Sequence, residues 1–115
     1  MLDKDNIFFK KKILIYGLGK SGLSSYRFLK KNNKIYLYDD NKIKNQNLEI
    51  KKKLIQYQDI IHEKIDCIII SPGIDIKKCK LKNFLKKNFS KIHTDLDVFY
   101  NYNKKNKNIT ITGTN

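Results

Sequence analysis

Residues 12–22 read KILIYGLGKSG and contain the clearest structural signal in the chain. Its first half, residues 12–16, is a short apolar run, which is typical of a strand buried in a sheet. The run ends at Gly17, where a GxGxxG pattern leads into a segment with the apolar spacing of a helix. A strand, a glycine turn and a helix in this order predict the first unit of a parallel α/β sheet.

The remainder of the chain repeats this alternation of apolar runs and helical patterns. Strands joined through helices run parallel, and right-handed connections place the helices on both faces of the sheet. The sequence therefore predicts a single Rossmann-like, doubly wound α/β domain with a parallel sheet of about five strands. The further strands are predicted at residues 35–38, 66–70, 90–93 and 109–112, and the helices at residues 21–29, 48–57, 81–85 and 95–102.

The 115 residues suit one domain and carry a formal charge of +14. This charge suggests nucleic-acid binding, but 24 of the 25 basic residues are lysines spread along the chain, and Arg27 is the only arginine. Base readout and bidentate phosphate contacts favour arginine, and the sequence has no RNP-like aromatic pattern and no helix-turn-helix signature. We expect no specific nucleic-acid function, although the charge predicts an attraction for anionic ligands.

Membrane, secreted and metal-binding classes do not fit the sequence. No apolar run approaches the ~20 residues of a membrane span, and the first twelve residues lack the pattern of a signal peptide, so we expect a cytoplasmic protein. We also expect a monomer. Cys67, Cys79, His62 and His93 lack the spacing of metal ligands, and we expect no bound metal. Cys67 lies in an apolar run and should be a core residue, whereas Cys79 should be a surface thiol.

The glycine turn after the first strand is a candidate binding site. In an open α/β sheet, ligands bind beyond the carboxyl ends of the strands. Gly19, Lys20 and Ser21 lie at this place, where the free N–H groups of a helix N-terminus bind phosphate. The glycines could instead serve only a tight turn.

Asp39, Asp40 and Asn41 end the second predicted strand. Asp39 lies 17 residues after Gly22, close to the spacing of the acid that binds ribose in dinucleotide-binding folds. This spacing favours a nicotinamide cofactor. The alternative is an acidic strand end exposed to water.

Ser71, Pro72 and Gly73 follow the third predicted strand, and Pro72 is the only proline in the chain. Proline and glycine after a buried strand fix a rigid turn. The Ser71 hydroxyl and the Gly73 N–H could face a bound anion, although a plain strand-ending turn explains the same residues.

Five stretches, taken in order, resemble the N-terminal region of MurD-type members of the Mur ligase family. The specific part of the resemblance is GLGxSG together with SPGI, and the resemblance covers essentially the whole chain. The stretches are residues 16–29 (YGLGKSGLSSYRFL), 36–41 (YLYDDN), 66–74 (DCIIISPGI), 94–101 (TDLDVFYN) and 109–115 (ITITGTN).

The resemblance implies that residues 1–108 form a domain that binds the UDP part of UDP-N-acetylmuramoyl-L-alanine. In this family the full enzyme uses ATP and Mg²⁺ to phosphorylate the substrate carboxylate, and the amine of D-glutamate then attacks the acyl phosphate, in peptidoglycan synthesis. Carried over by position, Lys20 and Ser21 would meet the nucleotide. Residues 39–41 would lie near the uracil and ribose, and residues 71–73 would line the diphosphate side.

Residues 109–115 resemble the strand and the first part of the family's ATP-binding loop. Gly113, Thr114 and Asn115 match the opening of that loop, which continues in the family with Gly-Lys-Ser/Thr. The lysine and the Mg²⁺-binding hydroxyl are not in the sequence. We therefore expect no productive binding of ATP or Mg²⁺, and no ligase activity, from this chain alone.

Two places depart from the family pattern. The family often has Thr or Ser at the position of Asp40, and a second carboxylate near a diphosphate would repel it. Asp40 should therefore point away from the diphosphate or contact the base. Where the family often has Gly and Glu, this sequence has Thr94 and Asp97, so any contact of the shorter acid should differ.

A free-standing NAD(P)-binding Rossmann module with a regulatory role is the alternative function. The GxGxxG pattern and Asp39 support it, whereas the SPGI and ITGTN stretches do not.

Overall fold

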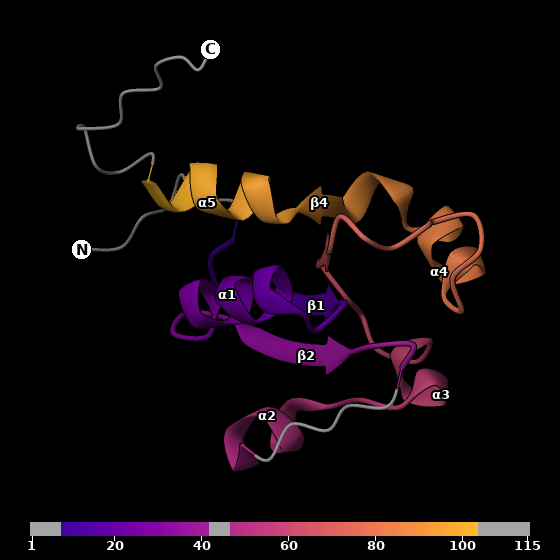
Figure 1. Cartoon of the computed structure of the whole chain (residues 1–115), viewed down its shortest axis with the longest axis horizontal. Coiled ribbons are helices and arrows are strands. Elements are labelled where there is room, and N and C mark those ends of the chain that lie inside the picture. The colour runs from indigo at the N-terminus through magenta and orange to yellow at the C-terminus, as the bar shows by residue number, and fades with distance from the viewer. Residues whose placement is uncertain (1–7, 42–46, 104–115) are drawn as a thin grey trace.

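A computed structural model describes residues 8–41 and 47–103, with side chains as far as residue 100 (Figure 1). Its four strands form one sheet in the order β2-β1-β3-β4, and every pair of neighbouring strands is parallel. The strands are β1 (Lys12–Tyr16), β2 (Lys34–Tyr38), β3 (Cys67–Ile70) and β4 (Ile92–Thr94), and the helices are α1 (Lys20–Leu29), α2 (Leu48–Lys53), α3 (Tyr57–Ile60), α4 (Lys82–Lys87), the 3-10 turn η1 (Phe89–Lys91) and α5 (Asp95–Asn103).

This sheet confirms the predicted Rossmann-like α/β fold. β1 lies between β2 and β3, so the connection from β1 to β2 and the connection from β2 to β3 cross the sheet in opposite directions. Such a reversal of strand order creates a crevice at the carboxyl ends of the strands. The strand predicted at residues 109–112 lies outside the described residues.

β1 is buried on both faces, because its side chains alternate between two apolar clusters. Ile13 and Ile15 pack in a cluster with Tyr26 of α1, and with Val98 of α5. Leu14 and Tyr16 pack in a second cluster, which α3 and α4 cover. Burying one such side chain contributes about 1.5–3 kcal/mol, so the central strand holds the two helical layers together.

The prediction of one helix over residues 48–57 is wrong, because the chain leaves the helix at Leu54. Leu54 forms a parallel bridge with Leu37 of β2, and the Ile55 N–H donates to the Leu37 carbonyl at 2.9 Å. Ile50 before the break and Ile55 after it pack in different clusters, on opposite faces of the sheet. Two short helices, α2 and α3, therefore replace the single helix.

Thr94 and Asp97, which depart from the family pattern, contact each other at the start of α5. The Thr94 N–H donates to the Asp97 carboxylate at 3.0 Å, and the Asp97 N–H faces the Thr94 hydroxyl at 3.4 Å. This reciprocal pair is a capping box in which Asp takes the place of the usual Glu or Gln. Thr94 and Asp97 thus fix the point at which β4 turns into α5.

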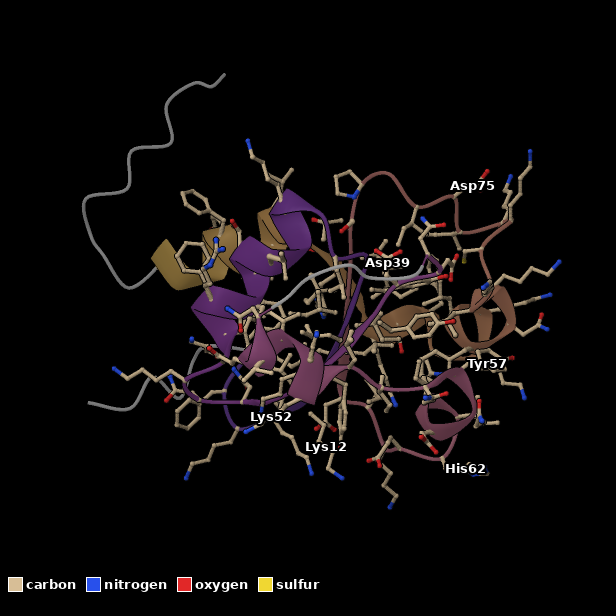
Figure 2. All side chains as sticks on the ribbon, turned by 60° about the horizontal axis from the view of Figure 1, so that its bottom comes forward. Lys12, Asp39, Lys52, Tyr57, His62 and Asp75 are labelled. Carbon is tan, nitrogen blue, oxygen red and sulfur yellow. The ribbon has the colours of Figure 1, made fainter. Side chains whose placement is uncertain are left out.

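The two ends of the parallel strands differ in the side chains that surround them. Figure 2 shows Lys12, Lys52 and His62 toward the lower edge of the molecule, Asp75 toward the opposite edge, and Asp39 between them, above the middle. Lys12 begins β1 and Asp39 follows β2, so the second edge is the one at the carboxyl ends of the strands. No helix in residues 8–41 or 47–103 is long and apolar enough to cross a membrane.

We expect the Tyr26 hydroxyl to make the free energy of unfolding decrease as the pH rises in the alkaline range. Burial and the hydrogen bond that this hydroxyl donates to Glu49 raise the pKa of Tyr26 from 10.0 to about 12. The folded state therefore holds this proton more tightly than the unfolded chain, and the stabilisation is complete below pH 10 and lost as the pH rises through about 12.

Urea denaturation at a series of pH values measures this effect. The Tyr26→Phe variant should show a shallower fall in the free energy of unfolding between pH 10 and pH 12 than the wild-type chain. An equally steep fall in both chains would mean that Tyr26 does not contribute.

Candidate functional site

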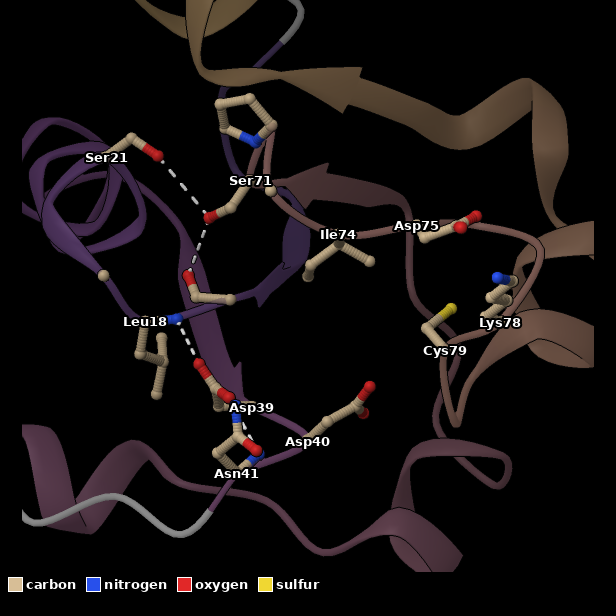
Figure 3. Close-up of a pocket in the computed structure, with 14 residues that line it drawn as sticks. Leu18, Ser21, Asp39, Asp40, Asn41, Ser71, Ile74, Asp75, Lys78 and Cys79 are labelled. Atoms are coloured by element: carbon tan, nitrogen blue, oxygen red, sulfur yellow. Dashed lines mark hydrogen bonds between the residues drawn. The ribbon is translucent and has the colours of Figure 1, made fainter.

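Three turns meet beyond the carboxyl ends of β1, β2 and β3 and enclose a pocket (Figure 3). One wall is the glycine turn, a second is the end of β2, and the third is the segment that follows β3. The structure brings together eight of the nine residues predicted to bind the UDP part, namely Gly19, Ser21, Asp39, Asp40, Asn41, Ser71, Pro72 and Gly73.

Lys20 is the ninth predicted residue, and it does not line this pocket. Lys20 is the first residue of α1 and borders a neighbouring hollow, together with Arg27 of the same helix and Leu96 of α5. Gly113, Thr114 and Asn115 lie outside the described residues.

Two glycines of the GxGxxG pattern are required by the fold itself. Gly17 has a φ of +101°, and a Cβ there would lie 2.6 Å from the Ser71 hydroxyl. A Cβ on Gly22 would lie 1.8 Å from the Gly17 carbonyl oxygen. That oxygen also accepts a hydrogen bond of 3.0 Å from the Ser71 hydroxyl. The end of β1, the start of α1 and the turn after β3 are therefore in direct contact.

Two other glycines face open space. A Cβ built on Gly19 or on Gly73 would meet no atom within 4 Å. Gly19 has φ −80° and ψ −160°, which is extended backbone that any residue adopts. The folded chain thus leaves room beside both residues, and both line the pocket.

The start of α1 offers hydrogen-bond donors to the pocket. Gly19 is the N-cap residue, and no side-chain hydrogen bond caps the helix there. The first N–H groups of a ten-residue helix then face the pocket with the positive end of the helix dipole. The Ser21 hydroxyl lies beside them, 3.5 Å from the Ser71 hydroxyl. These groups are the ones that bind phosphate oxygens in other α/β proteins.

Asp39 holds the glycine turn against the end of β2. One of its carboxylate oxygens accepts the Leu18 N–H at 2.7 Å, and the other accepts the Asn41 N–H at 2.9 Å (Figure 3). Asp40 follows, and its carboxylate is directed away from the glycine turn, toward the side of the pocket that holds Cys79. The two neighbouring acids therefore contact different walls.

The third wall contains residues that sequence reasoning missed. Ile74, Asp75, Lys78 and Cys79 line the pocket, since the chain folds back over it after the SPGI turn. The prediction that Cys79 is a surface thiol is wrong, because its side chain is buried in the second apolar cluster. The sequence carried only a weak signal for this, namely apolar residues at positions 79, 81 and 85, which keep one side of the segment against the core.

Cys67 is buried in β3, as predicted, and burial raises the pKa of its thiol. Within the part of the chain that the structure describes, no three His, Cys, Asp or Glu side chains are grouped so that they could hold a metal ion.

The parallel sheet and the pocket at its switch point place the chain among Rossmann-like α/β domains. Residues 11–93 match the family described as Mur ligase MurD-like, N-terminal domain. The chain belongs to this family.

Curated relatives agree with that assignment, and each is named UDP-N-acetylmuramoylalanine--D-glutamate ligase. The relative from Rickettsia bellii (strain RML369-C) is 36% identical over 110 residues, which cover 92% of this chain and 24% of the relative. The relative from Caldicellulosiruptor bescii is 38% identical over 114 residues, which cover 91% of this chain and 25% of the relative.

The relative from Rickettsia conorii is 34% identical over 109 residues, which cover 92% of this chain and 22% of the relative. The chain thus spans about a quarter of the length of the curated relatives that it matches. No solved structure matches the chain.

We expect the glycines of the turn to separate into two kinds on substitution. Gly22→Ala should destabilise the chain by about 1–3 kcal/mol, because the new methyl overlaps the Gly17 carbonyl oxygen, and this outweighs the gain of about 1 kcal/mol in helix propensity. Gly19→Ala is the matched control, and it should change stability by no more than about 1 kcal/mol.

Chemical denaturation of both variants measures the difference. Equal losses of stability would contradict the assignment of Gly22, and not Gly19, as the glycine that the fold requires.

Proposed function

We propose that this chain is the part of a D-glutamate-adding ligase that binds the UDP part of UDP-N-acetylmuramoyl-L-alanine. The observation that carries the proposal is the open space beside Gly19 and Gly73, in a pocket of a MurD-like N-terminal domain. The name of the curated relatives supports the choice of substrate.

In this proposal, neutral donors bind the diphosphate. The N–H groups at the start of α1 and the Ser21 hydroxyl face it from one side, and the Gly73 N–H faces it from the turn after β3. Ser71 lines the same side, but its hydroxyl donates to the Gly17 carbonyl and so supports the glycine turn. The two open glycines allow the phosphate oxygens to approach the backbone, as in other glycine turns that bind phosphates. Lys20 and Lys78, on either side, add positive charge near the diphosphate.

The uracil and ribose would lie beside the end of β2. Asp39, Asp40 and Asn41 border that side of the pocket, and the side-chain amide of Asn41 suits the N–H and hydroxyl groups of a nucleoside. The oxygens of Asp39 already accept two backbone N–H groups, so its first role is to set the shape of this side. This also weakens the alternative of a nicotinamide cofactor, in which the same carboxylate would bind a ribose.

The chemical step belongs to the whole ligase. We infer that ATP, with Mg²⁺, phosphorylates the substrate carboxylate, and that the D-glutamate amine displaces phosphate from the acyl phosphate to form the amide, in the cytoplasm during peptidoglycan synthesis. Residues 1–108 would hold the substrate by its nucleotide, and residues 109–115 would begin the ATP-binding domain. Holding the nucleotide fixes the carboxylate for reaction, and positioning of this kind lowers the barrier of a two-substrate step.

Isothermal calorimetry tests the proposal with UDP-N-acetylmuramoyl-L-alanine and, separately, NADH. The UDP compound should bind, and Gly19→Val should weaken its affinity by at least about tenfold, because the added side chain occupies the space that the phosphates need. The thermal stability of the variant should stay close to that of the wild-type chain.

Three outcomes would contradict the proposal. Binding of NADH alone would mean that the pocket serves a dinucleotide. Unchanged affinity of Gly19→Val would exclude the glycine turn as the phosphate site. Affinity that falls steeply with salt and ignores the identity of the anion would indicate non-specific attraction to the lysine-rich surface.

A further inference from the structure

The part of the third wall that follows the SPGI turn, residues 75–81, has little regular structure of its own, and it is called the wall below. Residues 75–81 connect the SPGI turn to α4, and their internal backbone hydrogen bonds are confined to a turn in which the Lys78 and Cys79 N–H groups both donate to the Asp75 carbonyl at 3.0 Å. A segment of this kind opens at a lower free energy than a strand or a long helix. Contacts with other elements must therefore hold it in place over the pocket.

Cys79 and Leu81 pack in the second apolar cluster, and the hydrogen bonds to the ends of β1 and β2 converge on Asp40 and Tyr16. The Tyr16 hydroxyl donates to one Asp40 carboxylate oxygen at 2.7 Å, and the Lys80 N–H donates to the other at 3.2 Å. The Lys80 ammonium also donates to the Asp40 backbone carbonyl at 3.1 Å. The Tyr16 hydroxyl itself accepts the Leu81 N–H at 3.4 Å. Four hydrogen bonds thus join the end of β1, the end of β2 and the wall.

The surroundings of Tyr16 keep its hydroxyl protonated, so that it remains a hydrogen-bond donor. Its side chain is fully buried, and burial together with the Asp40 hydrogen bond raises the pKa of Tyr16 far above its ordinary value. The hydroxyl therefore keeps its proton at every working pH, and a carboxylate is the acceptor that such a donor prefers. Leaving a buried hydroxyl or a carboxylate without its partner is costly, so the group of contacts favours one arrangement of the wall.

We propose that Asp40 is a positioning residue that, with Tyr16 and Lys80, holds residues 75–81 as a wall of the nucleotide pocket. Its carboxylate acts through the wall and leaves contact with the ligand to its neighbours. This inference rests on the proposed function for the identity of the ligand, but the holding of the wall can be measured without any ligand.

The two native cysteines allow opening of the wall to be distinguished from unfolding of the whole domain. Cys79 lies in it and Cys67 lies in the centre of the sheet, and both thiols are buried. Alkylation by iodoacetamide, followed by peptide mass spectrometry, gives the labelling rate of each thiol in the unmodified chain. Opening of the wall exposes Cys79 alone, whereas global unfolding exposes both.

Tyr16→Phe and Asp40→Asn should each raise the labelling rate of Cys79 by about tenfold or more. Tyr16→Phe removes the part-buried hydrogen bond to the Asp40 carboxylate, and Asp40→Asn removes the charge and one of the two acceptor oxygens. The rate at Cys67 should rise much less. Tyr26→Phe is the matched control, since it removes another tyrosine–carboxylate hydrogen bond, to Glu49, that lies away from the wall. An unchanged rate at Cys79, or equal increases at both cysteines, would overturn the proposal.

Calorimetry with UDP completes the test. Tyr16→Phe and Asp40→Asn should weaken UDP binding by about tenfold, whereas Tyr26→Phe should leave it unchanged. Equal affinity in all four chains would mean that the wall does not position the nucleotide, and would overturn the proposal. If the wild-type chain itself does not bind UDP, the proposed function fails, and the Cys79 labelling rates alone decide whether Asp40 holds the wall.

Discussion

The close approach of Gly17, Gly22 and Ser71 is the contact on which the pocket depends. The Gly17 carbonyl oxygen lies where a side chain of Gly22 would have to be, and the Ser71 hydroxyl donates to the same oxygen at 3.0 Å. α1 can therefore start directly against the end of β1, with the turn after β3 resting on both. This arrangement directs the N-terminus of α1 across the carboxyl ends of the strands, where the positive end of the helix dipole attracts anions.

The elements that the sequence predicts correctly are those whose signal is local. Buried parallel strands are continuous apolar runs, so residues 12–16 and 66–70 stand out without knowledge of their neighbours. The break at Leu54 has no such signal, because it depends on pairing with Leu37, seventeen positions earlier in the chain. The apolar spacing of residues 48–57 fits a helix until that partner is known.

The candidate site likewise contains residues that the sequence identifies and residues that it does not. The residues of the three turns were identifiable from Gly, Pro, Asp and Ser at the ends of apolar runs, and their meeting follows from the parallel sheet. Residues 75–81 were not identifiable, since Lys80 and Leu81 are held beside the pocket by hydrogen bonds to Asp40 and Tyr16, which lie far away in the sequence. The sequence of a connecting segment does not show which distant residues its polar groups contact.

The charges of the site also need the structure for their interpretation. Asp39, Asp40 and Asp75 all line a pocket that we assign to an anion, in a chain with a net charge of +14. Asp39 and Asp40 each accept hydrogen bonds from the protein, so part of their charge is already compensated. The lysines then supply attraction over distance, while neutral N–H groups decide where the anion rests.

The glycines give the strongest reason to connect this pocket with a ligand. Glycine loses more conformational freedom on folding than other residues, so a glycine in a folded domain needs a structural or functional cause. Gly17 and Gly22 have one within the chain, because both positions exclude a side chain. Gly19 and Gly73 have none: a side chain would fit at both, and among the described glycines only Gly17 has a positive φ. At Gly19, an N-cap Ser, Asp or Asn would serve the helix at least as well. What glycine uniquely provides at these two positions is an uncovered backbone, and both open onto the same pocket. We therefore infer that the cause lies outside the folded chain, in a molecule that approaches the backbone closely.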